Sequence, residues 1–461
     1  MSDKLVGIQI GAVSFVDEGV EPVLDILQER GAINALMLAS FTFTRGTGGR
    51  QIPGQPLPDH GVQEYDLDFR GGNYATIHPR YYATTVIGED ARAPDHGDWD
   101  FLAEVIPAAR QRGMACYAWI EESSYSALAQ KMANFIHLLE QDVYGRPTSQ
   151  PCFNNPLYRN WHFSLLEDYL KSYDLDGIQW CSERWGPLNN LIQGPAEARR
   201  AVCFCPHCRQ LARERGIDVE RARAGYLALA AWNQDVSQGE RPIDGAFVTF
   251  WRLLLQYPEI LAWAKLWADS QHQFFREIYG VVKAIDPAKQ VGWHIWHPNS
   301  FNPFFRAEQD FSVYRHFSDF IKPVLYNNCA GPRYHRFHHN LHKTLFADAQ
   351  PEETYAFMQR ILNLEEAPLA ELPTTGFSPD YVYRETRRTI ATAGPEVRIY
   401  PGIDVDIPTG PDETKCTRAG VRDAVLAAFR AGAHGVIISR KYSEMRLDNL
   451  SGVGDAIREL G

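Results

Sequence analysis

The sequence lacks several features that define whole classes of protein. No apolar run in its 461 residues approaches the ~20 residues of a membrane-spanning helix. No long block of like charge and no low-complexity tract interrupts the chain. The net charge of −11 argues against a surface for nucleic acid or anionic membranes. Met1 to Leu5 lead into a strand-like segment with no secretory leader pattern, which predicts a cytoplasmic protein.

Short apolar runs alternate with amphipathic helical segments along the chain. Eight runs are predicted as strands: 5–10, 33–41, 114–120, 176–181, 290–296, 319–326, 396–403 and 434–439. The helical segments between and after them are 21–30, 98–112, 156–173, 248–285, 421–431 and a last one ending at Glu459. The alternation predicts an α/β fold, a (β/α)8 TIM barrel that forms one domain over residues 1–461. A doubly wound open sheet is the rival, but Gly7 to Gly11 do not form its Gly-rich phosphate turn.

Three long insertions interrupt the predicted barrel, at 42–98, 185–246 and 327–380. Each follows the C-terminal end of a predicted strand, where barrels build their functional sites. We therefore expect the insertions to form lids or oligomer contacts around such a site.

Three of the eight cysteines form a C-x-C-x-x-C motif at Cys203, Cys205 and Cys208. Clustered thiols of a reducing compartment indicate metal ligands, and zinc prefers four of them in a tetrahedron. Three residues are candidates for the fourth ligand: Cys152, Cys181 and His207. We favour Cys152, because its loop precedes the helix that leads into the fourth strand. A site closed by four cysteines has no open coordination position, so its zinc would be structural.

Several segments in this region resemble glycoside hydrolase family 42 β-galactosidases. They are Gly145-Arg146, Cys152-Phe153-Asn154-Asn155-Pro156-Leu157-Tyr158-Arg159, Gln179 with Ser182-Glu183 and Gly186, and the Cys203–Cys208 motif. The resemblance implies a clan A (β/α)8 barrel, zinc on Cys152, Cys203, Cys205 and Cys208, and Glu183 as general acid/base after the fourth strand. It also allows a homo-oligomer, a trimer or a dimer. Ser182 stands where the family has Asn, and the seventh strand carries no Glu.

Glycoside hydrolysis needs two carboxyl groups that flank the scissile bond. Glu183 is the first, and its neighbours Trp180 and Trp185 predict a raised pKa that suits a general acid. Asp404, at the end of the seventh strand, is the best second carboxylate, with Asp406 as runner-up. The alternative interpretation of either aspartate is a helix cap.

Further polar and aromatic side chains gather at the predicted strand ends, as in sugar-binding pockets. The predicted substrate-binding residues are Glu121, Trp180, Trp185, His294, Trp296, His297, Tyr326, Asp406 and Arg440.

The leading hypothesis is a β-galactosidase-like glycoside hydrolase acting on a small oligosaccharide or glycoside. Glu183 would protonate the leaving oxygen, and Asp404 would serve as nucleophile or base. One alternative is a metal-dependent sugar isomerase, epimerase or lyase, with Glu183, His294 or His297, and Asp404 around one divalent ion. Another is a barrel that binds carbohydrate without catalysis.

Overall fold

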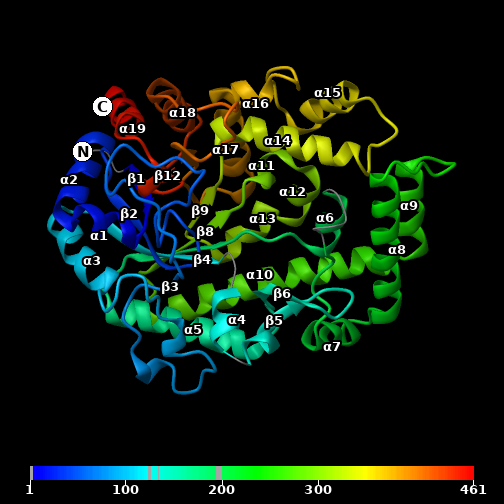
Figure 1. The fold of residues 1–461 in the computed structure, drawn as a ribbon, viewed down its shortest axis with the longest axis horizontal. Coiled ribbons are helices and arrows are strands. Elements are labelled where there is room, and N and C mark those ends of the chain that lie inside the picture. The colour runs from blue at the N-terminus through cyan, green and yellow to red at the C-terminus, as the bar shows by residue number, and fades with distance from the viewer. Residues whose placement is uncertain (1–3, 123–125, 133, 194–199) are drawn as a thin grey trace.

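The chain folds around a mostly parallel β-sheet that curls on itself, giving a TIM-barrel-like α/β structure (Figure 1). The computed structural model describes residues 4–122, 126–132, 134–193 and 200–461. The strands of this sheet are β1 (Leu5–Ile10), β2 (Ala35–Thr42), β3 (Gly72–Asn73), β4 (Ala115–Glu122), β7 (Gly177–Ser182), β8 (Gln290–Ile295), β9 (Phe320–Pro323), β10 (Arg398–Ile399), β11 (Gly402–Asp404) and β12 (Gly435–Ser439). Their order is β10-β9-β8-β7-β4-β2-β1-β12-β11, with β3 paired to β2.

The curled sheet closes through β10 and β11, which are the two halves of the predicted seventh strand. β10 pairs with β9, and β11 pairs with β12. The backbone N–H of Tyr400 donates to Ile321 O (3.0 Å), and that of Leu325 donates to Gly402 O (3.1 Å). Pro401 lies between the two halves and interrupts the strand because it has no N–H to donate. The hydrogen bonds of β10 to β9 and of β11 to β12 still join the seventh strand to both of its neighbours.

The eight strands predicted from sequence are all present, with small shifts at their ends. The prediction of one helical stretch over 248–285 is wrong. Two helices occupy it, α9 (Ala246–Gln256) and α10 (Glu259–Ile285). Pro258 separates them because its ring disfavours helical backbone at the preceding Tyr257 and removes one N–H donor.

Helices surround the barrel and fill its insertions (Figure 1). Besides α9 and α10, of which α10 packs against the barrel wall, the helices on or near the wall are α1 (Ala12–Glu18), α2 (Val20–Gly31), α3 (Phe101–Gln111), α5 (Pro156–Ser172), α11 (Pro298–Phe301), α12 (Pro303–Glu308), α13 (Phe311–Tyr314), α17 (Pro379–Ala393), α18 (Arg418–Arg430) and α19 (Leu447–Glu459). The others are α4 (Ser126–Lys131), α6 (Pro187–Ile192), α7 (Pro206–Glu214), α8 (Val219–Ser237), α14 (Asn327–His342), α15 (Pro351–Leu362) and α16 (Leu372–Thr375). A hairpin of β5 (Leu139–Gln141) and β6 (Pro147–Pro151) follows α4.

The three predicted insertions follow the C-terminal ends of β2, β7 and β9. The first is mostly irregular and carries β3. The second carries α6, α7 and α8, and its residues 194–199 lie outside the described ranges. The third contains α14 to α16. In Figure 1, α8 and α9 stand side by side at one end of the molecule, away from β1 and β2.

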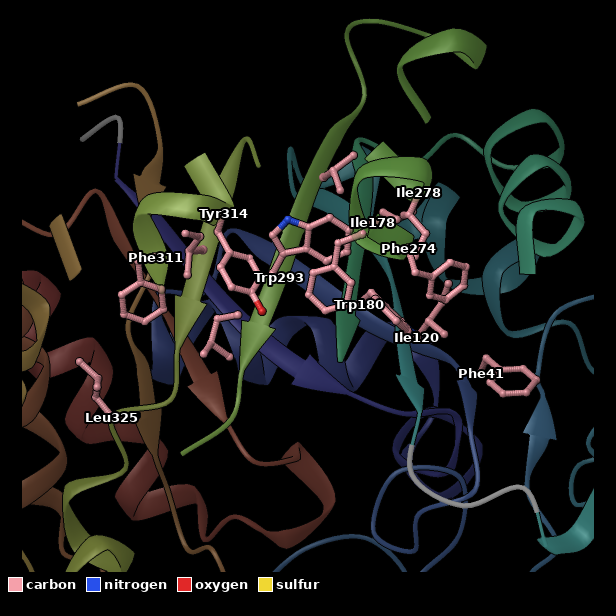
Figure 2. Packing of buried hydrophobic residues seen from close by; sticks show 14 of the residues in the cluster. Phe41, Ile120, Ile178, Trp180, Phe274, Ile278, Trp293, Phe311, Tyr314 and Leu325 are labelled. Carbon is pink, nitrogen blue, oxygen red and sulfur yellow. The ribbon is translucent and has the colours of Figure 1, made fainter. Parts of the chain in front are cut away.

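A layer of aromatic rings joins the barrel wall to α10. The rings of Phe275 and Trp293 stack at 4.4 Å between centroids, and Trp180 meets Phe275 edge-on at 4.7 Å. Figure 2 shows Trp180 beside Trp293, and Phe274 of α10 meets the Trp180 ring edge-on at 5.3 Å. Side chains alternate along a strand, so Trp180 points out of the barrel while its neighbour Gln179 points in. Trp180 is therefore a core residue, and its predicted role in substrate binding is wrong.

None of the helices in the described ranges combines the length and the apolar character needed to cross a membrane.

Candidate active site

A cavity of about 620 Å³ opens at the C-terminal ends of the barrel strands. Eight of the residues predicted from sequence line it: Glu121, Glu183, Trp185, His294, Trp296, His297, Tyr326 and Arg440. Residues that the sequence analysis did not select also line it, among them Gln9 of β1, Trp119 of β4, and Arg333 and Arg336 of α14. The barrel therefore brings most of the predicted site together.

Glu183 follows β7 and meets His294 of the neighbouring strand β8. The Glu183 Oε1 atom lies 3.1 Å from His294 Nε2, and the glutamate side chain is 43% exposed. Desolvation opposes ionisation, but the hydrogen bond from His294 and the charges of Arg333 and Arg440 outweigh it and lower the pKa of Glu183. The expectation of a raised pKa is wrong, because cations rather than apolar rings dominate around this carboxyl.

His294 continues a polar chain toward the barrel interior. Lys322 Nζ lies 3.2 Å from His294 Nδ1 and donates to the Tyr326 hydroxyl (3.0 Å) and to Gln9 Oε1 (2.8 Å). An ionised Glu183 only accepts, so His294 carries its proton on Nε2 and accepts from the Lys322 ammonium on Nδ1.

Burial changes the acidity of both cationic members of this chain. Desolvation and the Lys322 charge lower the pKa of His294, so the imidazole is neutral at pH 7. Desolvation also lowers the pKa of Lys322 to about 7, against the opposing effect of Cys181, Glu183 and Glu121. The ammonium and amine forms of Lys322 therefore coexist near neutral pH.

Glu121, at the end of β4, is the second carboxylate that lines the cavity among the described residues. Its Oε2 accepts from the hydroxyl of Thr42 on β2 at 2.7 Å. The two strands are neighbours, with Thr42 in register with Glu121. The threonine thus fixes the direction of this carboxylate toward the mouth of the barrel.

The structure does not bring Asp404 to Glu183. Asp404 is buried at the end of β11, and its carboxylate accepts from the backbone N–H groups of Asn328 (3.3 Å) and Cys329 (3.0 Å) in the first turn of α14. Desolvation raises its pKa to about 6, against these two hydrogen bonds. Asp404 does not line the Glu183 cavity, and its contacts are those of the alternative interpretation, a helix cap.

Asp406 also lies outside this cavity. Its carboxylate accepts from Arg446 N (2.8 Å), Arg446 Nη2 (2.9 Å) and Asn449 Nδ2 (2.9 Å). These bonds tie the loop after β11 to the start of α19, so Asp406 has a structural role instead of the predicted contact with substrate.

Aromatic rings form one wall of the cavity. The centroids of Trp185 and Trp296 lie 4.4 Å apart with their planes tilted by 55°, and Phe305 packs edge-on against both. Phe301 and Phe337 extend the apolar lining. Such a surface suits the C–H face of a sugar ring, and the surrounding carboxylates and guanidinium groups suit its hydroxyls.

The four cysteines predicted as metal ligands lie together. The sulfur atoms of Cys152, Cys203, Cys205 and Cys208 are all within 4.8 Å of one another. Cys152 Sγ is 3.5 Å from Cys208 Sγ and 3.4 Å from Cys205 Sγ. The backbone N–H of Asn154 donates to Cys152 Sγ at 3.3 Å. Four buried sulfurs at this spacing fit the donor set of a tetrahedral zinc ion.

Arg184, the residue directly after Glu183, connects Glu183 to this cysteine cluster. Its guanidinium donates to Pro151 O (2.5 Å) and lies 4.1 Å from the centre of the Phe153 ring, so it touches both neighbours of Cys152. It also pairs with Glu122 at 2.5 Å. The backbone that carries Glu183 is thereby anchored to the cysteine cluster.

The metal-dependent alternative finds little support in this geometry. Cys181, Glu183 and His294 have potential ligand atoms within 4.8 Å of one another, but Asp404 is not among them. Lys322 contacts His294, and Arg333 and Arg440 act on Glu183. Because these groups are cationic, they oppose a divalent ion at this position.

No family model matches the chain, and no curated protein sequence matches it. Its fold is similar to that of the β-galactosidase from the psychrophilic Marinomonas ef1 (TM-score 0.56, 11% identity) and of the β-galactosidase from the Antarctic haloarchaeon Halorubrum lacusprofundi (TM-score 0.55, 14% identity). Each comparison covers 99% of this chain and only 59% or 58% of the other. The chain thus spans about three fifths of either β-galactosidase chain, and the likeness shows the TIM-barrel-like fold.

Proposed function

We propose that the protein is a glycoside hydrolase that cleaves a small oligosaccharide or glycoside. The observation that carries this proposal is the pair of carboxylates, Glu121 and Glu183, in one aromatic-lined cavity at the C-terminal end of a barrel. The likeness in fold to two β-galactosidases agrees with it. A β-galactosidase-like activity is the narrower form of the proposal.

Glu183 is assigned the transfer of a proton to the leaving oxygen. It is ionised in the free protein, so the proton comes from His294 Nε2, whose Nδ1 takes one from Lys322 in turn. One proton thus moves from Lys322 to the departing alcohol while the glycosidic C–O bond breaks. The near-neutral pKa of Lys322 suits the donor end of this chain.

Glu121 is assigned the role of the second carboxylate, which the sequence analysis gave to Asp404. Held by Thr42, it either attacks the anomeric carbon or takes a proton from the attacking water. Trp185 and Trp296 bind the sugar face, and Tyr326, His297 and Arg440 supply polar contacts.

A structural zinc ion on Cys152, Cys203, Cys205 and Cys208 is part of the proposal. It would leave no open position for substrate, and it would brace the loop that Arg184 ties to Glu183. The proposed cytoplasmic location suits a small soluble substrate, and a dimer or trimer remains the proposed assembly.

The deciding experiment is a panel of aryl glycosides and disaccharides tested with the wild-type chain and with Glu183→Gln and Glu121→Gln. We expect turnover of at least one glycoside and a loss of 10³-fold or more in kcat in each variant, on the order expected for removing a catalytic carboxyl. Zinc content and melting temperature should match the wild type. A complete lack of turnover by the wild-type chain would reject hydrolysis, and sugar binding measured by calorimetry would then indicate a carbohydrate-binding barrel.

A further inference from the structure

The proposed active-site cavity gathers positive charge in a chain that is negative overall. Three arginines line it, Arg333, Arg336 and Arg440, against the two carboxylates Glu121 and Glu183. The chain as a whole carries a net charge of −11. A binding site for a neutral sugar has no need for a surplus of guanidinium groups.

The three arginines differ in their partners. Arg336 pairs with Glu413 at 2.6 Å, and Arg440 lies 3.6 Å from Glu444. Arg333 has no carboxylate within 4 Å among the described residues. Its guanidinium lies 3.0 Å from His297 Nδ1 and 6.0 Å from the centre of the Tyr326 ring. Most of its fork of N–H donors is therefore available to a ligand in the cavity.

His297 holds Arg333 in this orientation. The imidazole is 1% exposed, and burial together with the Arg333 charge lowers its pKa well below the usual value. It is neutral, so Nδ1 accepts from the guanidinium and Nε2 carries the proton. This buried Nε2 has no hydrogen-bond partner in the described part of the chain. A neutral imidazole of the cavity wall thus holds the guanidinium of Arg333 in place.

We infer that the cavity takes a carbohydrate that bears a carboxylate, a uronic-acid glycoside, and that Arg333 binds this carboxylate. A planar guanidinium matches a carboxylate through two parallel N–H···O bonds. One free guanidinium near Glu121 and Glu183 suits a monoanion better than a doubly charged phosphate, which both glutamates would repel. The inference rests on the proposed function for the sugar part of the ligand.

Binding of an anion at Arg333 also bears on the chemistry of Glu183. Arg333 is one of the cations that hold the pKa of this carboxyl down. A substrate carboxylate that neutralises Arg333 removes that effect and makes Glu183 a better proton carrier once the substrate is bound. A neutral glycoside leaves Arg333 uncompensated.

Calorimetry with the Glu183→Gln chain tests the inference without turnover. The ligands are matched pairs of the same anomer: methyl glucuronoside with methyl glucoside, and methyl galacturonoside with methyl galactoside. We expect one uronoside to bind at least tenfold more tightly than its neutral partner. When Arg333→Gln is added to the Glu183→Gln chain, the affinity for the preferred uronoside should fall by about 10- to 100-fold, the range for a charged hydrogen-bonded pair.

Two controls keep the result interpretable. Arg333→Lys retains the positive charge but not the forked N–H donors of a guanidinium, so it should lose less affinity than Arg333→Gln. Arg430 is an exposed residue of α18, so Arg430→Gln should bind the uronoside as tightly as the Glu183→Gln chain does. Equal binding of charged and neutral partners, or uronoside affinity that survives Arg333→Gln, overturns the inference. Tighter binding of methyl galactoside 6-sulfate than of either uronoside also overturns it, because the anion would then be an ester.

The proposed function can fail independently. Arg333-dependent uronoside binding without hydrolysis of any aryl uronide upholds the binding inference and rejects the hydrolase. Hydrolysis of neutral aryl glycosides with no preference for uronides upholds the hydrolase and rejects the inference.

Discussion

His294 Nε2 lies 3.1 Å from Glu183 Oε1, and this contact is the first of the favourable interactions that keep Glu183 ionised. The same imidazole is buried between Glu183 and Lys322, with its other nitrogen 3.2 Å from the lysine Nζ. A carboxylate, a neutral imidazole and a lysine with a pKa of about 7 therefore form one hydrogen-bonded chain from the cavity into the barrel.

Replacing His294 should change the pH dependence of activity as well as its size. In His294→Ala, the proton path from Lys322 to Glu183 is cut, so the alkaline limb of the kcat/KM profile no longer follows Lys322 and moves to lower pH, toward the pKa of Glu183 itself. We expect kcat to fall by roughly 10²- to 10⁴-fold, the usual worth of a positioned proton donor. His316→Ala, an exposed residue after α13, is the matched control. An unshifted alkaline limb would exclude His294 from the proton path.

Burial of Lys322 should be visible in the pH dependence of stability. Its pKa is about 7 in the folded chain and about 10.4 in an unfolded one, so the unfolded state binds the extra proton between these values. The contribution of Lys322 to stability therefore rises with pH across that window, by about 1.4 kcal/mol per pH unit.

Urea unfolding of the wild type and of Lys322→Met at pH 7, 8, 9 and 10 checks this sign. Other groups titrate in the same window, so the quantity to follow is the difference between the two proteins, which should favour the wild type more as pH rises. Lys171→Met, at an exposed position of α5, should give a difference that stays flat. A flat difference for Lys322→Met would show that the lysine stays charged in the fold.

Local pattern was sufficient to predict the strands and most of the cavity. Parallel strands that are buried on both faces appear as continuous apolar runs, and the polar residues just after them must meet at one end of a barrel. This is why Glu121, Glu183 and His294 could be found from sequence. The side-chain alternation that directs Trp180 outward was also readable, since Gln179 next to it faces the interior.

The remaining features depend on contacts between distant segments. Arg333 reaches the cavity from α14, in an insertion with no strand register to guide a prediction. Lys322 owes its low pKa to burial in the barrel interior, where its ammonium lies against Gln9, His294 and Tyr326, and Gln9 is 313 residues away in the chain. Asp404 became a helix cap because α14 begins directly over the end of β11, a placement that no local sequence signal encodes.

Asp404→Ala separates the two interpretations of that residue. Loss of the cap leaves two backbone N–H groups of α14 without an acceptor and should cost about 1–2 kcal/mol in the free energy of unfolding. Activity of the folded variant should fall by less than tenfold, because the carboxylate does not line the cavity. A fall in kcat as large as that of Glu183→Gln, with stability unchanged, would restore Asp404 as a catalytic carboxylate.

Metal analysis of the purified chain should find about one zinc ion per protein. Cys208→Ser should lose it and lower the melting temperature, because three thiolates remain of a closed four-sulfur site. Cys181→Ser is the matched control: its thiol is equally buried but lies beside Glu183 and His294, so zinc content should not change. Since Arg184 ties the cluster to the backbone of Glu183, we also expect kcat of Cys208→Ser to fall at temperatures where the chain is still folded. If Cys208→Ser retains zinc and Cys181→Ser loses it, the ion lies beside Glu183 and His294 instead, and the metal-dependent alternative is favoured.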